Sequence, residues 1–210
     1  MLNADFVQFL RFSCKFLCTI LSNIVVMAKA FDDESLVRQF NRGDETAFDR
    51  IVEGYSADIA VLANRLLGWP GEVEDIVQDV FLAAFLGLKK FRCECSLKSW
   101  LFTITINKCR SYRYKQMIYL RFFSRAAVKA SAAGACDESK ARMDDETFHK
   151  VRLAVLALPL RYREPVVLRY LQELSTDEII QILGISKNAL QVRLSRARER
   201  LRQDLAELTG

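Results

Sequence analysis

The chain has 210 residues, of which 51% are hydrophobic and 27% charged, with only 8 Gly and 3 Pro. This composition excludes a fibrous or disordered chain and is typical of a helix-rich globular protein with room for two small domains. The net charge of +5 is modest, but residues 31–81 carry four Arg and twelve Asp or Glu, whereas residues 92–129 carry nine Lys or Arg and a single Glu. Residues 187–203 add six basic residues and one Glu. We therefore expect an acidic surface for a cationic protein and two basic surfaces for a polyanion such as nucleic acid.

The first part of the chain has the pattern of a targeting segment. An apolar run from Phe16 to Met27 follows Arg11 and Lys15, and the small residues of Ala28-Lys29-Ala30 come after it. The run mimics a signal peptide and is too short to span a bilayer. Our preferred hypothesis is that translation starts at Met27 and that residues 1–26 are an upstream extension that contributes little to function. The segment 1–30 as a whole is therefore expected to be an N-terminal extension that is either not translated or disordered. An amphipathic anchor for a membrane or a partner is the alternative.

Helical periodicity begins at Asp32 and defines the first predicted domain, residues 31–118. Apolar residues recur there at three- and four-residue steps, which is the spacing of one face of an α-helix. Gly43-Asp44 is expected to separate the first two helices, and the Gly-Trp-Pro-Gly sequence of residues 68–71 to end the second. Two more helices are predicted, from residue 72 to 88 and from about Lys98 to Lys115.

Residues 119–145 are predicted to be a linker. Between about Phe122 and Asp145 the composition changes to Ala, Ser, Gly and Lys without any period, which is typical of a flexible segment. Periodicity returns over the second predicted domain, residues 146–208, where Leu158-Pro159 breaks the first helix and a further helix is expected from Glu164 to Leu171. The sequence thus predicts an all-α fold of two small helical domains joined by a flexible linker.

A helix-turn-helix is predicted near the C-terminus. Ser175 and Glu178 have the spacing of a capping box, which starts a helix at Thr176. Gly184 then supplies the left-handed residue of a tight turn, and Ser186 caps a second helix. That helix carries an apolar stripe flanked by basic residues, so that its N-terminal half suits a DNA major groove. The stripe consists of Leu190, Leu194, Ala197, Leu201 and Leu205.

Six Cys and one His give little support for metal or catalytic chemistry. The cysteines lack the spacing of a disulfide framework, and reduced thiols are the preferred interpretation. A metal at Cys14 with Cys18, or at Cys93 with Cys95, is the alternative that we do not favour, since His149 is the only His. We find no catalytic triad, phosphate loop or metal cluster and therefore predict neither an enzyme nor a cofactor, a metal site or a small-molecule substrate.

Two blocks of sequence resemble bacterial sigma factors of the extracytoplasmic-function (ECF) group, in the sigma-70 family. LPLRYR at 158–163, LGIS at 183–186 and RLSRAR at 193–198 resemble region 4 of that family. DIVQDVF at 75–81, SWL at 99–101 and the following Ile106-Asn107 resemble region 2. The blocks stand in the family's order, and the resemblance covers about residues 33–207. It implies that 31–118 is a region 2 domain and 146–208 a region 4 domain.

The resemblance also implies what each region contacts. Region 2 would dock on the coiled coil of the largest RNA polymerase subunit, and region 4 would contact the flap of the second-largest. The implied polymerase-binding residues are Glu72, Asp75, Gln78 and Asp79. The implied contacts to the −10 promoter element lie at the end of a strand-opening loop near Arg92 to Ser99 and on the helix that follows it, and they are Lys98, Ser99, Asn107, Lys108, Arg110, Ser111, Arg113 and Lys115. The implied contacts to the −35 element are Lys187, Asn188, Gln191, Val192, Arg193, Ser195, Arg196 and Arg200.

The function that this resemblance implies is that of an alternative sigma factor, which binds core RNA polymerase in the cytoplasm and recognises −35 and −10 elements of promoter DNA. An anti-sigma factor is the implied regulator. The chain departs from the family pattern at 188–192, where a Gly-Thr-Val-Lys-Ser sequence is usual, and this predicts an altered sequence preference. Trp100 is expected in the core rather than stacked on a base. The alternative function is a one-component regulator whose residues 31–118 sense a ligand.

Overall fold

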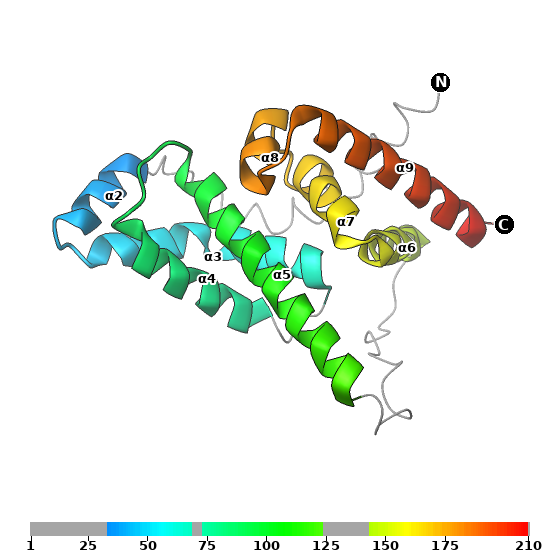
Figure 1. Cartoon of the computed structure of the whole chain (residues 1–210), viewed down its shortest axis with the longest axis horizontal. Helices are drawn as coiled ribbons and strands as arrows, with labels where there is room; N and C mark the ends of the chain where they lie inside the picture. The colour runs from blue at the N-terminus through cyan, green and yellow to red at the C-terminus, as the bar shows by residue number, and fades with distance from the viewer. Residues whose placement is uncertain (1–32, 69–72, 124–142, 210) are drawn as a thin grey trace.

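The computed structural model describes residues 33–68, 73–123 and 143–209, and every element assigned within these ranges is a helix (Figure 1). The prediction of an all-α fold is therefore confirmed for the described part of the chain. The N-terminal extension, Glu72 and most of the predicted linker lie outside the described residues.

The first domain consists of α2 (Asp33–Asn41), α3 (Thr46–Leu67), α4 (Val73–Leu88) and α5 (Leu97–Phe123). The predicted breaks are confirmed. Gly43 has a φ of 98° between α2 and α3, and Gly68, with a φ of 79°, ends α3 by donating its N–H to the carbonyl of Asn64. Side chains with a Cβ are strained at such angles, which explains why glycine stands at both positions.

An aromatic cluster joins α2, α3 and α4. The Phe85 ring lies edge-on to the rings of Phe40 and Phe48, with centroid distances of 5.3 and 5.1 Å. Phe48 also meets Phe81 at 6.3 Å. Edge-to-face pairs at these distances stabilise a core beyond the area they bury. The inner face of α4 is thereby fixed, which determines which residues its outer face presents.

Helix α5 is longer than the sequence predicted. The expected end was about Lys115, but the helix continues to Phe123 and enters the segment assigned to the linker. Periodicity failed to show this because Tyr114, Lys115 and Met117 are exposed, so no buried stripe marks the last turns. Figure 1 shows this end of α5 extending beyond the neighbouring helices.

The second domain contains α6 (Met143–Ala157), α7 (Leu160–Val166), the π-helical segment η2 (Val167–Leu171), α8 (Thr176–Leu183) and α9 (Lys187–Thr209). The helix predicted from Glu164 begins earlier, at Leu160, because Pro159 lies just before the first turn, where its missing N–H costs nothing. Pro165 lies inside α7. The helix then continues as the wider π-helical turn of η2, and a turn leads from there to α8.

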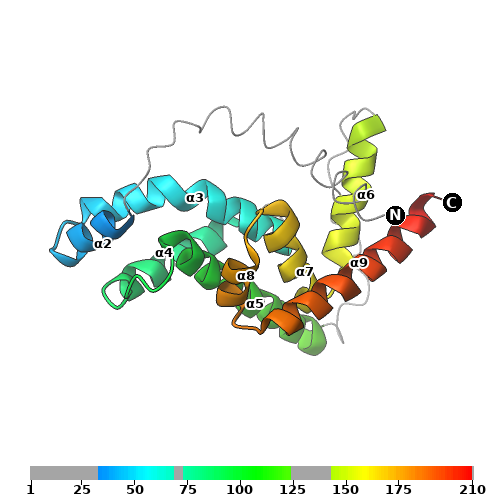
Figure 2. The same cartoon turned by 90° about the horizontal axis from the view of Figure 1, so that it is seen from above.

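The two domains pack against each other rather than standing apart. Their buried apolar residues form one continuous cluster, and α8 packs on α5 (Figures 1 and 2). The domains also approach closely at the end of α3, where a Cβ added to Gly68 would lie 2.7 Å from Cδ1 of Leu156 on α6. The sequence predicted both domains but not this closed arrangement.

Candidate polymerase and DNA interface

The outer face of α4 is polar at one end and apolar at the other. Val73, Ile76, Val80 and Ala84 turn inward, so the residues on the opposite side of the helix reach the surface. We call these residues the α4 outer surface: Asp75, Gln78, Asp79, Leu82 and Leu86, all of them exposed. Leu82 is 59% and Leu86 70% exposed, and sequence reasoning missed both. The sequence did carry a signal for them, because both leucines lie outside the apolar stripe that faces the core.

Helix α5 carries the positive charge that the composition indicated. Its 27 residues include six Lys or Arg and no Asp or Glu. Ser96 caps the helix, since its Oγ accepts the Ser99 N–H at 3.1 Å and donates to the Ser99 Oγ at 2.9 Å. Ser99 itself is only 3% exposed. It was predicted to contact DNA, but its side chain is taken up by this cap and does not reach the surface.

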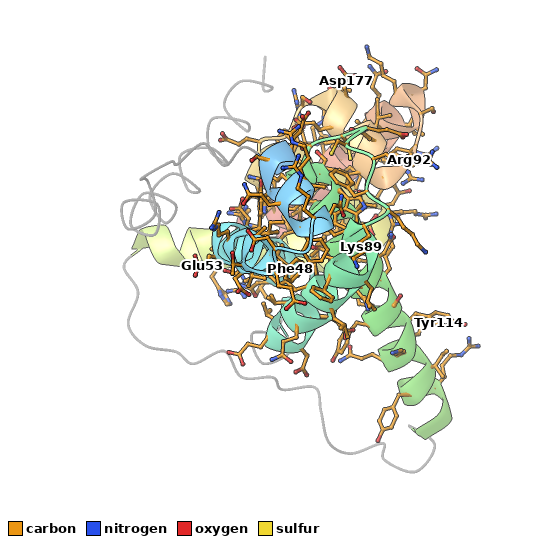
Figure 3. All side chains as sticks on the ribbon, turned by 90° about the vertical axis from the view of Figure 1, so that its left-hand side faces the viewer. Phe48, Glu53, Lys89, Arg92, Tyr114 and Asp177 are labelled. Atoms are coloured by element: carbon orange, nitrogen blue, oxygen red, sulfur yellow. The ribbon has the colours of Figure 1, made fainter. Side chains whose placement is uncertain are left out.

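The other residues predicted for the −10 element differ in how accessible they are. Asn107, Ser111 and Lys115 are exposed at four-residue steps and line one side of α5. Tyr114 lies beside them, 60% exposed, on the part of α5 that extends away from the other helices (Figure 3). An aromatic ring among basic and polar side chains is the arrangement that single-stranded nucleic acid binds by stacking.

Four basic residues of the same predicted set are partly engaged by carboxylates or backbone carbonyls. Lys98 pairs with Asp58 at 2.8 Å and Lys108 with Asp79 at 3.5 Å. Both pairs are well exposed, so they contribute little to stability and exchange readily for other anions. Arg113 donates to the carbonyl of Leu66 at 3.4 Å. Arg110 is held most firmly, by Glu164 of α7, which raises the pKa of the guanidinium.

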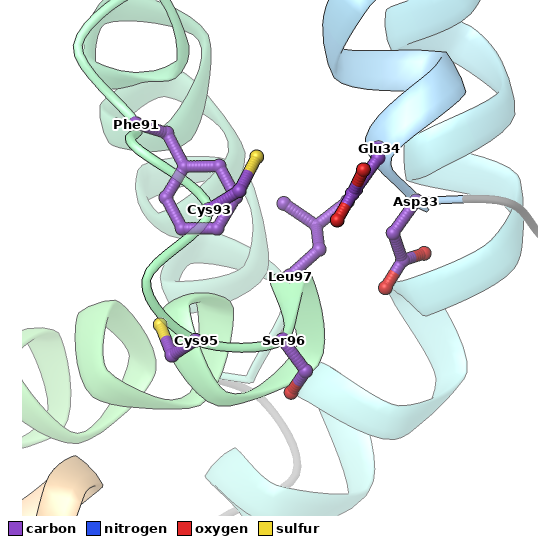
Figure 4. Close-up of a pocket in the computed structure, with 7 residues that line it drawn as sticks. All are labelled: Asp33, Glu34, Phe91, Cys93, Cys95, Ser96 and Leu97. Carbon is purple, nitrogen blue, oxygen red and sulfur yellow. The ribbon is translucent and has the colours of Figure 1, made fainter.

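The loop between α4 and α5 was predicted to open the DNA strands. Figure 4 shows Cys93 and Cys95 in this loop, opposite Asp33 and Glu34 at the start of α2, with their sulfur atoms on different sides of the chain. Both thiols are free, and burial is the main cause that raises the pKa of Cys95. No group of three His, Cys, Asp or Glu suited to a metal ion occurs among the residues that the structure describes.

Two aromatic side chains pack behind this loop. Phe91 lies against Trp100, with ring centroids 4.9 Å apart, and Trp100 also covers Gly87 of α4. Trp100 is partly buried and packs on the core, as the sequence predicted. It therefore supports the loop from within.

The helix-turn-helix is confirmed in detail. The Ser175 Oγ accepts the Glu178 N–H at 3.3 Å, and the Glu178 carboxylate accepts the Ser175 N–H at 2.8 Å, which completes the capping box. The Ser175 Oγ also donates to the Glu178 carboxylate at 2.7 Å, and this hydrogen bond, followed by the one from the Ser175 N–H, lowers the pKa of Glu178. Gly184 takes a φ of 63° in the turn, and the Ser186 Oγ accepts the Ala189 N–H at 3.2 Å. The second helix, α9, thus begins at Lys187 in a fixed direction.

The outer side of α9 presents most of the residues predicted for the −35 element. Leu190, Ala197 and Leu201 are buried, and this fixes the rotation of the helix. The predicted residues that are exposed on it are Lys187, Asn188, Gln191, Val192, Ser195, Arg196 and Arg200. Arg193 is only partly exposed, on the flank. Polar, amide and guanidinium groups on the first half of such a helix match the hydrogen-bonding edges of bases in a major groove.

Tyr162 of α7 contacts Arg196 and Arg200 of α9. Its buried ring lies under the guanidinium of Arg200, at 4.9 Å from the centroid, and Arg161 lies at the same distance. The side chain of Arg196 is the main cause that lowers the pKa of the Tyr162 phenol. Stacking of guanidinium groups on an aromatic ring limits the conformations they adopt. Sequence reasoning placed Tyr162 in a family motif without assigning it this contact.

The helix-turn-helix of α8 and α9, together with the basic helix α5, which has no acidic residue, defines the class of the protein. It is a DNA-binding protein of two helical domains. Two family models match the chain, Sigma-70 region 2 over residues 51–117 and Sigma-70, region 4 over residues 148–201. The Bacillus subtilis (strain 168) ECF RNA polymerase sigma factor SigW is 32% identical over 184 residues, which cover 82% of this chain and 96% of SigW. The RNA polymerase sigma factor NccH of Alcaligenes xylosoxydans xylosoxydans is 33% identical, covering 80% and 92%.

A solved structure agrees with these relatives. CnrH in complex with the cytosolic domain of CnrY has a TM-score of 0.62 and 27% identity, covering 83% of this chain and 97% of CnrH. The chain belongs to the ECF group of RNA polymerase sigma factors. It is an alternative sigma factor, which binds core RNA polymerase and directs transcription from specific promoters. The region 2 match falls where the alternative hypothesis needed a ligand sensor, so a one-component regulator is not favoured. Within the described ranges, no helix is both long and apolar enough to cross a membrane.

Proposed function

We propose that α4, α5 and α9 each bind a different partner during promoter recognition. The α4 outer surface binds the coiled coil of the largest polymerase subunit. The exposed side of α5 and the loop before it bind the −10 element, and the outer side of α9 reads the −35 element. The observation that carries this assignment is the charge of α5, six basic residues with no acidic one, next to an α4 whose outer surface holds only acidic, amide and apolar groups.

Each surface suits its proposed partner chemically. Basic side chains and an exposed Tyr114 on α5 provide phosphate contacts and a stacking platform for unpaired bases. On α9, Arg196 and Gln191 have the donor and acceptor groups that discriminate base pairs in a major groove. On α4, acidic groups direct a cationic partner and the two leucines supply area to bury.

We further propose that the chain carries no catalytic step itself. Bond formation during transcription belongs to the polymerase, and this subunit contributes binding energy that selects and opens a promoter. We place this activity in the cytoplasm, where the polymerase and its template are. Because CnrH is solved together with the cytosolic domain of CnrY, we also propose that an anti-sigma factor regulates this chain.

Run-off transcription from genomic fragments tests the assignment. The full chain, added to bacterial core polymerase, should start transcripts at discrete sites that core polymerase alone does not use. The chain without core polymerase should give no transcripts and bind the same fragments weakly. Failure to produce any specific transcript, together with tight operator binding in the absence of polymerase, would refute the proposal.

A further inference from the structure

Two exposed arginines from different helices of region 4 meet over one buried aromatic ring. Arg161 of α7 and Arg200 of α9 each lie 4.9 Å from the centroid of the Tyr162 ring. The ring is only 4% exposed, whereas both arginines are exposed. Helix α7 packs against α9 (Figure 1), so this contact places a basic residue of α7 beside the outer side of α9. We call Arg161 and Arg200 the Tyr162 arginine pair.

The Tyr162 arginine pair carries charge that the described residues do not neutralise. Within the described part of the chain, neither arginine forms an ion pair with a carboxylate. Glu164, the only acidic residue of α7, is bound to α5. Glu199, the residue before Arg200, is bound to Arg202 at 3.0 Å. Two like charges held close together repel each other, so binding of an anion between them is favoured.

The guanidinium groups of the pair have the donors that such an anion requires. Each has five N–H donors in a planar fork, which matches two oxygen atoms of one phosphate. Because both groups lie at the same distance from one ring centroid, their central carbon atoms are separated by at most twice that distance. The pair is therefore close enough to bind one phosphate group or two neighbouring phosphates of a single strand.

The position of Arg200 on α9 separates it from the residues that face base edges. Arg200 comes 13 residues after Lys187, the first residue of α9, which corresponds to roughly 20 Å along the helix axis at about 1.5 Å per residue. A DNA major groove is only about 12 Å wide. When the first half of α9 lies in the groove, Arg200 and the neighbouring Arg161 therefore lie outside it, at the sugar-phosphate backbone.

Tyr162 holds these arginines in place without contacting DNA itself. Stacking on its buried ring limits the conformations of Arg161 and Arg200. Arg196 donates a hydrogen bond to the phenol oxygen, which is the main cause that lowers the pKa of Tyr162, and the charges of the three arginines act in the same direction. Side chains that are ordered before binding lose less conformational entropy when they bind a phosphate. Tyr162 is thus a positioning residue.

We propose that Arg161 and Arg200, positioned by Tyr162, form a phosphate-binding site for the DNA backbone at the edge of the −35 element. The inference rests on the proposed assignment of α9 to that element, and it adds α7 to the interface. Duplex DNA is the ligand because the site is continuous with the outer side of α9. The site binds a phosphodiester and not a base, so it contributes equally on promoters of different sequence.

Substitution of Arg161 tests the site in the complete holoenzyme. The full-length chain carrying Arg161→Gln is combined with core polymerase, and the Kd for promoter fragments is measured over a series of salt concentrations. We expect about three- to tenfold weaker binding near physiological salt, and a salt slope that is smaller by about 1, as the loss of one phosphate contact predicts. Arg200→Gln should have the same effect. Both losses should be equal on fragments that differ in their −35 sequence.

Arg202→Gln is the matched control, because it removes the same charge from an exposed position of α9 that is paired with Glu199. It should keep the Kd and the salt slope of the wild type. Equal losses in Arg161→Gln and Arg202→Gln would show a general charge effect and overturn the site. Unchanged binding by Arg161→Gln would overturn it too, and so would a loss that varies with the −35 sequence, since that is the behaviour of a base contact.

The positioning role of Tyr162 is tested by two substitutions. Tyr162→Phe keeps the ring under both arginines and should retain most of the affinity. Tyr162→Leu removes the ring and should weaken binding about as much as Arg161→Gln does. Adding Arg161→Gln to Tyr162→Leu should then cause little further loss, because the arginine is no longer held in place. Losses that multiply in the double variant would overturn the positioning role, since a general effect on the fold gives independent losses.

A promoter with a scrambled −35 element tests the proposed function separately. The wild-type holoenzyme should bind this fragment more weakly, and Arg161→Gln should reduce the remaining affinity by the same factor as before. If scrambling has no effect on the wild type, the assignment of α9 to the −35 element is wrong, and the phosphate site at its edge falls with it. If scrambling weakens binding but Arg161→Gln does not, the phosphate site is wrong and the assignment of α9 stands.

Discussion

Leu86 of α4 provides a quantitative test of the proposed polymerase surface. Its side chain is 70% exposed although it lies on a helix whose other face is well packed. Burying a whole leucine side chain contributes about 1.5 to 3 kcal/mol, so covering the exposed part of Leu86 would contribute about 1 to 2 kcal/mol. We expect Leu86→Ala to weaken binding to core polymerase by that amount, which is about five- to thirtyfold in Kd.

The assay is titration of core polymerase with labelled full-length chain in the absence of DNA. Met117→Ala is the control, because Met117 is 48% exposed on α5, outside the α4 outer surface. Both variants should keep the unfolding midpoint of the wild type within experimental error, since exposed substitutions rarely change stability by more than about 0.5 kcal/mol. An unchanged Kd for Leu86→Ala, or equal losses in the two variants, would refute the docking role of the α4 outer surface.

Two other predictions concern region 4. Arg196→Ala in the holoenzyme should weaken binding to a preferred promoter by about 1 to 3 kcal/mol if it reads a base, and a uniform loss across unrelated promoters would restrict it to phosphate contact. Ser175→Ala should lower the free energy of unfolding by about 1 kcal/mol, as loss of an N-cap does, and Thr176→Ala should not. Because the folded state depresses the pKa of Glu178, its contribution is present above the ordinary glutamate pKa, near 4.5, and is lost as the pH falls further. The difference between wild type and Ser175→Ala in urea unfolding should therefore shrink below about pH 4.5, and a difference that does not depend on pH would remove Glu178 from the cap.

The elements that the sequence predicted well are those defined by short-range chemistry. The capping box of Ser175 and Glu178 and the turn at Gly184 each depend on residues at most a few positions apart. The rotation of α9 follows in the same way from the stripe that contains Leu190 and Leu201. Local hydrogen bonding and helical periodicity therefore located α9 and its outer side without any tertiary information.

Features that depend on distant partners were not predictable. Arg110 and Glu164 are 54 residues apart, and nothing in either local pattern indicates the pair. The role of Ser99 was not predictable either, because a serine hydroxyl group can contact DNA or take part in a helix cap, and the local sequence does not distinguish the two. The exposed leucines of α4 were missed because they lie outside the apolar stripe that periodicity assigns to the core, and periodicity gives no role to an apolar residue on the outer side of a helix.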